Sequence, residues 1–286
     1  MYATPATANE LIERARSLGA LSTPGGFRDR SFVHRVAKGH SIVRRGGRSY
    51  LMNRETAQLV QKPAQAAPQA AAPANPADQS GGWAAWTSWT NPTGNAISSF
   101  RTTWTVPPPP ASQSGQLIYL FNGLQDPAGA EILQPVLQWG ESGAGGGNSW
   151  FVASWHVDSK GHAFCTPAIP VEPGTQVTGV ISLIATFADG THNYSCAFDG
   201  IDDTTLIAQG LGDLPVAEET LEAYGVTAQD QYPAAASIDM TAIDIEVGGT
   251  PAVLSWAPFN LQNPTLGEHA VVGSNANPGG QVSLFT

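Results

Sequence analysis

The 286 residues suit one large domain with extensions, or two domains, and a hydrophobic content of 42% is enough for a sizeable core. No apolar run reaches the roughly 20 residues of a membrane-spanning helix, and the N-terminus lacks the basic start and apolar stretch of an ordinary signal peptide. A net charge of −10 argues against nucleic acid and anionic membranes as partners.

The charge is divided unevenly along the chain. Residues 1–80 carry 11 basic and 5 acidic side chains, whereas residues 81–286 carry 2 basic and 18 acidic ones. The two parts therefore have formal charges of +6 and −16. This asymmetry predicts either a basic tail for an external polyanion or a basic segment that binds the acidic part of its own chain.

The N-terminal part reads as a basic segment followed by a linker. A capping-box pattern at Thr7–Glu10 predicts a helix over residues 6–19, and short β-like runs follow within residues 26–62. The next stretch is rich in Pro, Ala and Gln, which predicts an exposed, protease-sensitive linker because such a composition cannot build a core. The predicted organisation is a basic segment over 1–62, a linker over 63–82 and a main domain over 83–286.

From Trp83 onward the sequence predicts β-strands almost throughout. Short alternating runs are separated by Gly, Pro, Asn and Asp, and "ADGT" at 188–191 is a hairpin signal between two of these runs. No helical stretch is long enough for a crossover between parallel strands, so we expect antiparallel pairing. The predicted fold class is all-β, an antiparallel β-sandwich preceded by the small basic segment.

The strand "EILQPVLQWG" at 131–140 has polar residues within an apolar run. Leu133 and Leu137 fall on one face, and Gln134 and Gln138 fall on the other. Pro135 cannot donate to a sheet ladder and predicts an edge, a bulge or a bend. The two glutamines either face solvent, or they are buried and serve a purpose that requires a polar group.

The stretch "AEETLEAYGV" at 217–226 concentrates carboxylates, three within five residues. Such a run is most often a solvated face, but in a strand Glu218 and Glu222 would line one side together. The histidines show no zinc-binding spacing, the glycines no phosphate-binding loop, and the serines no nucleophile elbow. No metal and no cofactor is therefore expected.

Taken in order, these pieces resemble the glutamic peptidases, or eqolisins. The matching stretches are "ILQ" ending at Gln134, "ASWHV" at 153–157, "IPVEPGTQVTGVI" at 169–181 and "EETLEAY" at 218–224. Relative to the family pattern, Asn122 replaces a usual Asp, and Ser154 lies near the position of an acidic residue. The resemblance covers roughly residues 83–250 and implies a concanavalin-like jelly-roll sandwich.

The resemblance also implies a site and an activity. Gln134 and Glu222 take the positions of the two catalytic residues, and the chain would be a secreted, acid-acting endopeptidase with a polypeptide substrate. The residues expected to line the substrate cleft are Asn122, Gln138, Ser154, Trp155, His156 and Glu218. His156 has a simpler alternative as a surface or internally bonded histidine.

The chemistry of such a pair is coherent. A carboxylate can act as the general base on a water that attacks a peptide carbonyl, and a Gln amide can stabilise the negative oxygen that forms. The basic segment over 1–62 would then be an inhibitory propeptide, held by charge at neutral pH and released as carboxylates protonate in acid.

Two further classes of function stay open on sequence grounds. A carbohydrate-binding or carbohydrate-cleaving sandwich could stack sugars on tryptophans and pair carboxylates such as Glu131 and Glu222. A non-catalytic surface or structural protein could have kept the same fold. The tryptophans considered for stacking are Trp139, Trp150, Trp155 and Trp256.

The two cysteines, Cys165 and Cys196, both lie in strand-like stretches of the acidic part. A disulfide between them and two buried thiols are equal alternatives.

Overall fold

The computed structural model describes residue 17 and residues 19–61, 82–259 and 266–286. Except for residues 17 and 19, the predicted helix over 6–19 lies outside these residues. The predicted linker over 63–82 lies outside them except for Gly82. The helix and the linker therefore stay predictions.

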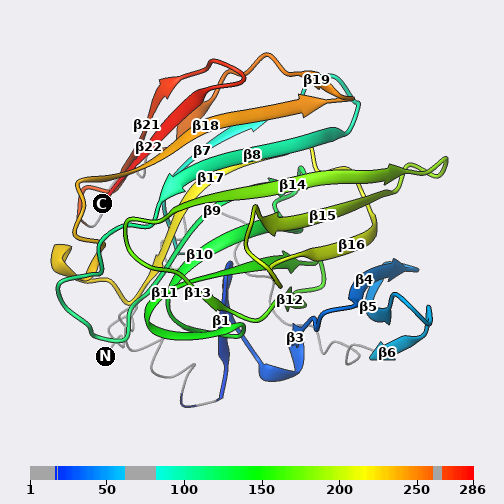
Figure 1. Ribbon diagram of the computed structural model, residues 1–286, viewed down its shortest axis with the longest axis horizontal. Coiled ribbons are helices and arrows are strands. Elements are labelled where there is room, and N and C mark those ends of the chain that lie inside the picture. Colours follow the sequence, from blue (N-terminus) through cyan, green and yellow to red (C-terminus); the bar gives the residue numbers. More distant parts are fainter. Residues whose placement is uncertain (1–16, 18, 62–81, 260–265) are drawn as a thin grey trace, which may run out of the picture.

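The described residues form two large sheets, which confirms the all-β sandwich (Figure 1). The described chain also contains two short 3-10 helices, η1 (Arg30–Phe32) and η2 (Gln229–Gln231). None of its helices is long and apolar enough to cross a membrane.

Nine strands of the described chain make the sheet that carries both predicted catalytic residues. In spatial order they are β20 (Ala257–Phe259), β7 (Trp83–Thr90), β17 (Val216–Tyr224), β9 (Leu117–Gln125), β10 (Ile132–Ser142), β11 (Gly145–Val157), β12 (Ala163–Cys165) and β3 (Val33–Arg35), with β13 (Ile169–Pro170) also paired to β11.

The second large sheet has eleven strands in the described chain. Their order is β21 (His269–Ser274), β22 (Gly280–Phe285), β18 (Ser237–Val247), β8 (Ile97–Thr105), β14 (Gln176–Thr186), β15 (His192–Phe198), β16 (Leu206–Leu211), β4 (His40–Arg45), β5 (Arg48–Asn53) and β6 (Leu59–Gln61), with β19 (Thr250–Pro251) also paired to β18. The predicted hairpin at 188–191 is confirmed, since Thr186 pairs with His192 across it.

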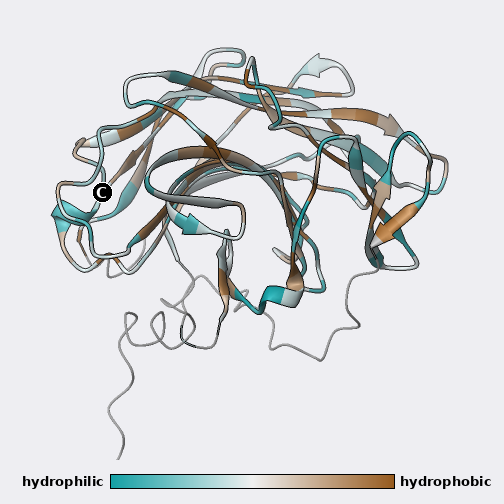
Figure 2. Ribbon diagram, turned by 60° about the horizontal axis from the view of Figure 1, so that its bottom comes forward, coloured by the Kyte–Doolittle hydropathy of each residue, from teal (hydrophilic) through white to brown (hydrophobic). Residues whose placement is uncertain are grey.

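The nine-stranded sheet is buried on both faces. Its inner face packs against the eleven-stranded sheet through a main core that includes Leu120, Leu137 and Trp104. Its outer face carries a second cluster that includes Tyr119 and Val136. Figure 2 shows the two sheets as curved layers with apolar stretches along strands of both. A central strand such as β10 can therefore be buried over residues 132–140, and Gln134 and Gln138 lie inside the protein.

The basic N-terminal segment is built into both sheets. β3 pairs in parallel with β12, and β4 pairs in parallel with β16, whereas the other strand pairs of the described residues are antiparallel. Ile42, Leu51 and Val36 of the segment are buried in the main core. A separate hairpin, β1 (Leu21–Thr23) with β2 (Gly26–Arg28), packs on the outer face of the nine-stranded sheet. Figure 1 shows β3 to β6 beside β12 and β16.

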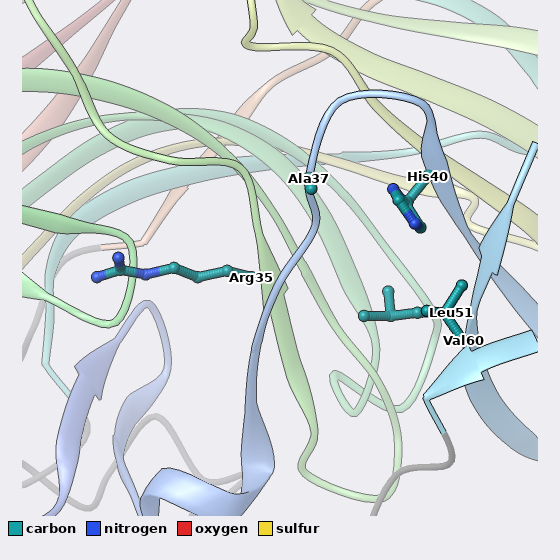
Figure 3. Close-up of a pocket in the computed structure, with 5 residues that line it drawn as sticks. All are labelled: Arg35, Ala37, His40, Leu51 and Val60. Atoms are coloured by element: carbon teal, nitrogen blue, oxygen red, sulfur yellow. The ribbon is translucent and has the colours of Figure 1, made fainter.

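A surface pocket lies wholly within this segment. Figure 3 shows its lining, which comes from β3, β4, β5, β6 and the connection between β3 and β4. The lining residues are Arg35, Ala37, His40, Leu51 and Val60. None of the residues predicted to form a catalytic site contributes to this pocket.

Replacing Ile42 by Ala should destabilise the whole protein by about 2–5 kcal/mol, because it opens a cavity in the core that the segment shares with the sandwich. Denaturant unfolding, followed by tryptophan fluorescence, measures the free energy. The control is Val253→Ala, since Val253 is 91% exposed. A loss no larger than that of the control would mean that the segment adds nothing to the common core.

Candidate functional site

Gln134 lies inside the protein on the outer face of β10. Its neighbours Leu133 and Leu137 point into the main core, so alternation puts Gln134, Val136 and Gln138 on the opposite face. Gln134 is 1% exposed, and its Oε1 has no hydrogen-bond partner within the described chain. A buried amide oxygen without a partner is costly, so this position calls for an explanation beyond packing.

Glu218 lies across the sheet from Gln134, with only a glycine between them. Glu218 pairs with Gly123 of β9, and the register of β9 with β10 places Gly123 opposite Gln134. Three neighbouring strands span about 10 Å, a distance that two long side chains on one face can close. Gly123 has no side chain to fill the space between them. A Cβ there would lie 3.1 Å from Ile132 Cδ1.

Burial of Glu218 favours the protonated form of its carboxyl group. The residue is 4% exposed, and its Oε2 has no hydrogen-bond partner among the residues described. Burial raises the pKa of Glu218 to about 8, because an isolated carboxylate is poorly solvated there. The face thus holds a neutral acid and an amide on either side of Gly123.

Glu222 shares this face but lies four residues further along β17. It pairs with Tyr119, and Tyr119 pairs with Gln138 instead of Gln134. Four residues of strand correspond to about 13 Å. Gln134 and Glu222 are therefore separated by more than one water, and the residue that the register brings to Gln134 is Glu218.

Glu222 already has partners in this structure. Its Oε1 accepts a hydrogen bond from Gly25 N at 2.7 Å and another from the Tyr224 hydroxyl. Burial raises the pKa of Glu222 to about 7, and the bonds from Tyr224 and Gly25 and the charge of Arg28 limit the rise.

The remaining predicted cleft residues divide between the two faces. Gln138 and Trp155 share the face of Gln134. Gln138 is held internally, because its Nε2 donates to Gly145 O at 2.9 Å and Ser142 Oγ donates to its Oε1 at 3.0 Å. Trp155 is fully buried in the outer cluster.

Asn122, Ser154 and His156 lie on the inner face, because strand neighbours alternate. They do not line the surface that carries Gln134. His156 Nε2 lies 2.9 Å from Glu131 Oε1, and Glu131 also pairs with Arg44 of the N-terminal segment. Burial alone would raise the pKa of Glu131, but the bond from His156 and the charges of His156 and Arg44 outweigh it and lower the pKa.

Glu219 was not singled out by the sequence, yet it is as completely buried as Glu222. It lies on the inner face, where its carboxyl group bonds to the Thr102 hydroxyl of the opposite sheet. Thr87 and Asn122 are its cross-strand neighbours. Burial raises the pKa of Glu219 well above its ordinary value, and the Thr102 bond only partly opposes this. In the sequence, the apolar residues Ala217 and Leu221 share a face with Glu219, and this pattern could have indicated that Glu219 is buried.

The N-terminal segment covers this sheet through a cluster of titratable groups. His34 Nε2 of β3 lies 3.0 Å from His162 Nδ1 of the loop between β11 and β12. Asp158 of the same loop accepts hydrogen bonds from Ser49 Oγ and from His162 N. Arg28 donates through Nε to Gly161 O at 2.8 Å.

The two imidazoles of this cluster favour the neutral state. Burial and, to a smaller extent, the neighbouring His162 lower the pKa of His34 to about 4, and Asp158 partly opposes the shift. Burial also lowers the pKa of His162, with Asp158 raising it and Arg28 lowering it. A contact between two histidines requires at least one neutral ring, because two cations at 3.0 Å repel one another.

The two cysteines are free thiols in the structure. Cys165 belongs to the outer cluster and Cys196 to the main core, so the sheet separates them and the disulfide alternative is wrong. No group of three or more His, Cys, Asp or Glu residues that could hold a metal ion occurs in the described ranges.

No protein-family model matches the sequence, and no curated protein matches it significantly. Among solved structures, the chain is similar to scytalido-glutamic peptidase with a peptide-based transition-state analogue, at a TM-score of 0.47 and 12% identity, covering 70% of this chain and 98% of that one. It is also similar to SCP-B, an eqolisin in complex with the tripeptide Ala-Ile-His, at 0.44 and 13%, covering 71% and 98%.

A toad ovary galectin in complex with thio-digalactose gives a TM-score of 0.31 at 14% identity, covering 57% of this chain and 98% of that one. TM-scores and sequence identities this low do not establish a function. The function therefore has to be argued from the side chains of this chain.

Replacing Glu219 by Gln should flatten the pH dependence of stability. The folded-state pKa lies above the ordinary value of 4.5, so the stability that the protonated carboxyl group contributes is complete below that value and is lost as pH rises. One such group lowers the free energy of unfolding by up to about 1.4 kcal/mol per pH unit. Denaturant unfolding between about pH 4 and pH 8 measures the slope.

The matched control for this change is Glu55→Gln on the exposed surface. If the Glu219→Gln protein lost stability with pH as steeply as the unmodified chain, the buried carboxyl group would not be the cause.

Proposed function

We propose that this chain is the latent form of an acid-acting endopeptidase of the glutamic-peptidase type. Its water-activating pair would be Gln134 and Glu218, which replaces the earlier pairing of Gln134 with Glu222. One observation carries this proposal: Glu218 and Gln134 flank Gly123 on one sheet face, and each has a buried oxygen with no partner in the described chain.

The reaction needs one proton carrier and one neutral donor. The ionised Glu218 takes a proton from water, and the water oxygen attacks the peptide carbonyl carbon. The carbonyl electron pair moves to oxygen, and the Gln134 amide N–H donates to the oxyanion. Glu218 then gives its proton to the amide nitrogen, and the carbon–nitrogen bond breaks.

In the latent form, here called the closed form, the N-terminal segment covers the sheet, and Glu218 cannot take a proton from water in acid. With its pKa raised to about 8 by burial, Glu218 stays protonated below that pH and cannot accept a proton. Exposure to water would return the pKa towards the ordinary value of about 4.3. Glu218 would then be ionised in mild acid and could act as the base. In this proposal the latent and active forms differ in whether water reaches the Glu218 side chain.

Residues 1–62 would act as the inhibitory propeptide, and the polypeptide substrate would replace them. The described part of this segment places β1–β2 on the outer face and joins Arg44 to Glu131 and Lys38 to Asp203. Lys38–Asp203 is exposed and contributes little, whereas Arg44–Glu131 is mostly buried. A peptidase with an acid optimum would act outside the cell, which agrees with the secretion expected from the family resemblance.

The carbohydrate alternative has no comparable support in the geometry. Trp139, Trp150, Trp155 and Trp256 are all buried, so their ring faces do not form a surface for a sugar. Glu131 is bound by Arg44 and His156, and Glu222 by Gly25 and Tyr224. No second function is therefore proposed.

Glu218→Gln should abolish hydrolysis of a denatured protein at about pH 4, with a loss of roughly 10²–10⁴-fold. Gln134→Ala should lower kcat by roughly 10²–10³-fold, because the oxyanion loses a donor. Product peptides measured by mass spectrometry at about pH 4 and pH 7 give the rates. The control is Glu172→Gln on the exposed surface.

The Glu222→Gln variant distinguishes Glu218 from Glu222 as the general base. If Glu222→Gln abolished hydrolysis while Glu218→Gln retained it, the base would be Glu222. An unmodified chain that cleaves no peptide bond at either pH, with or without its N-terminal segment, would end the peptidase proposal.

Acid should release the N-terminal segment once the chain is cut within residues 63–81. A histidine whose folded-state pKa is depressed stabilises the closed form above its unfolded pKa, about 6.5, and loses this effect as pH falls towards about 4. Protonation of Glu131 would also break the pair with Arg44. Glu218 and Glu222 both oppose release, because their raised pKa values favour the closed form in acid.

The experiment introduces a protease site within 63–81, cuts the full chain and follows co-elution of the two pieces by size-exclusion chromatography between about pH 7 and pH 3. His34→Gln should move release to lower pH, since the amide can still bond to His162 without titrating. His269→Gln, on the exposed surface, is the control. Tighter association at low pH would contradict an acid-released propeptide.

A further inference from the structure

The hairpin β1–β2 is bound unlike the rest of the N-terminal segment. β3 and β4 extend the two large sheets by ladder hydrogen bonds, whereas β1 and β2 pair only with each other among the described strands. The hairpin instead lies on the outer face, where side chains of the sheet contact it and Gly143 N of the β10–β11 turn donates to Ser22 O at 2.8 Å. A peptide held in this way, outside the strand ladders, can be exchanged without opening a sheet.

The turn of this hairpin presents a main-chain donor to a buried acid. Pro24 and Gly25 occupy the centre of the turn, and Gly25 has a φ of 81°, in the region that favours glycine. Thr23 Oγ1 donates to Gly26 O at 2.7 Å and fixes the turn. Gly25 N then donates to Glu222 Oε1 at 2.7 Å.

The two strands of the hairpin rest on two tyrosines. Ser22 and Phe27 are directly opposite each other across the hairpin. Ser22 Oγ lies 2.6 Å from the Tyr119 hydroxyl oxygen, and the Phe27 ring meets the Tyr224 ring edge to face at 5.5 Å. The two tyrosine rings are themselves 6.4 Å apart at 75°. Together they form an aromatic floor with hydroxyl groups at its rim.

Glu222 has acceptor capacity that the fold does not use. Its Oε1 receives both the Gly25 N–H and the Tyr224 O–H, whereas Oε2 is buried and has no partner among the described residues. A carboxyl group kept only for packing would be replaced by a less costly side chain. A second main-chain donor from a longer peptide would satisfy Oε2.

The distance from the proposed pair suits an extended peptide. Glu218 and Glu222 lie on one face of one strand, about 13 Å apart. An extended chain covers that distance in about four residues. A peptide bound along this face with its cleaved bond at Glu218 would therefore place a main-chain N–H over Glu222 about four residues away, and a side chain over Tyr224 about six residues away.

We propose that Tyr119, Glu222 and Tyr224 form a peptide-binding subsite that takes a main-chain N–H on Glu222 and an aromatic side chain on Tyr224. The β1–β2 hairpin fills this subsite in the closed chain, with Phe27 as the aromatic group. The inference rests on the proposed function and names its substrate class: polypeptides with an aromatic residue about six positions from the cleaved bond.

Cleavage of a mixed peptide library by the acid-treated full chain tests the subsite. Products mapped by mass spectrometry should show Phe, Tyr or Trp enriched at one fixed position, about six residues from the cleaved bond. Tyr224→Leu should remove the enrichment and raise KM for aromatic peptides by about three- to tenfold, with kcat little changed. Tyr50→Leu in β5 is the control. Cleavage without positional enrichment would overturn the subsite and leave the peptidase standing.

A binding measurement covers the case in which no peptide is cleaved. The full chain carrying Phe27→Ala, which loosens its own hairpin, is titrated by calorimetry with a synthetic peptide of residues 20–28. This peptide should bind about three- to tenfold more tightly than the same peptide with Phe27→Ala. Absence of binding, or equal affinity of the two peptides, would overturn the subsite whether or not the chain is a peptidase.

Discussion

Three carboxyl groups buried in one strand are the constraint on which the rest of the structure depends. β17 carries Glu218 and Glu222 on its outer face and Glu219 on its inner face, and each is almost completely removed from water. Because an unpaired buried carboxylate is costly, all three have raised pKa values and favour the protonated state. The folded chain therefore binds protons that the unfolded chain would release at neutral pH, and acid stabilises the sandwich.

The contacts of the N-terminal segment have largely the opposite dependence on pH. The His34–His162 contact favours neutral rings, and the Arg44–Glu131 pair requires an ionised carboxylate, so acid weakens both. A fall in pH therefore favours the protonated carboxyl groups of β17, whereas it weakens most of the contacts that hold the N-terminal segment. In the proposed latent peptidase, such an arrangement would let a fall in pH weaken the contacts of the N-terminal segment while the sheet that carries Gln134 and Glu218 stays folded.

The fold could be predicted from the sequence because strand alternation and turn residues are local signals. The hairpin at 188–191 and the β-like runs of the basic segment appear in the structure as β14–β15 and β3 to β5. The choice between Glu218 and Glu222 could not be predicted in the same way. It depends on the register of β17 with β9 and of β9 with β10, which long-range pairing sets and no local pattern encodes. The faces of Asn122, Ser154 and His156 followed from alternation alone, once each strand's buried face was known.

The N-terminal segment combines two roles that involve different residues. β3 and β4 cover the edges of β12 and β16, and unpaired edges of this kind invite pairing with other chains. Ile42 and Leu51 add apolar surface to the common core, so these strands support folding. The hairpin β1–β2 contributes little to either edge and instead lies over Tyr119, Glu222 and Tyr224. The edge strands therefore complete the sheets and the hairpin controls access to the outer face, so release of residues 1–62 has to break the β3–β12 and β4–β16 ladders as well as the contacts of the hairpin.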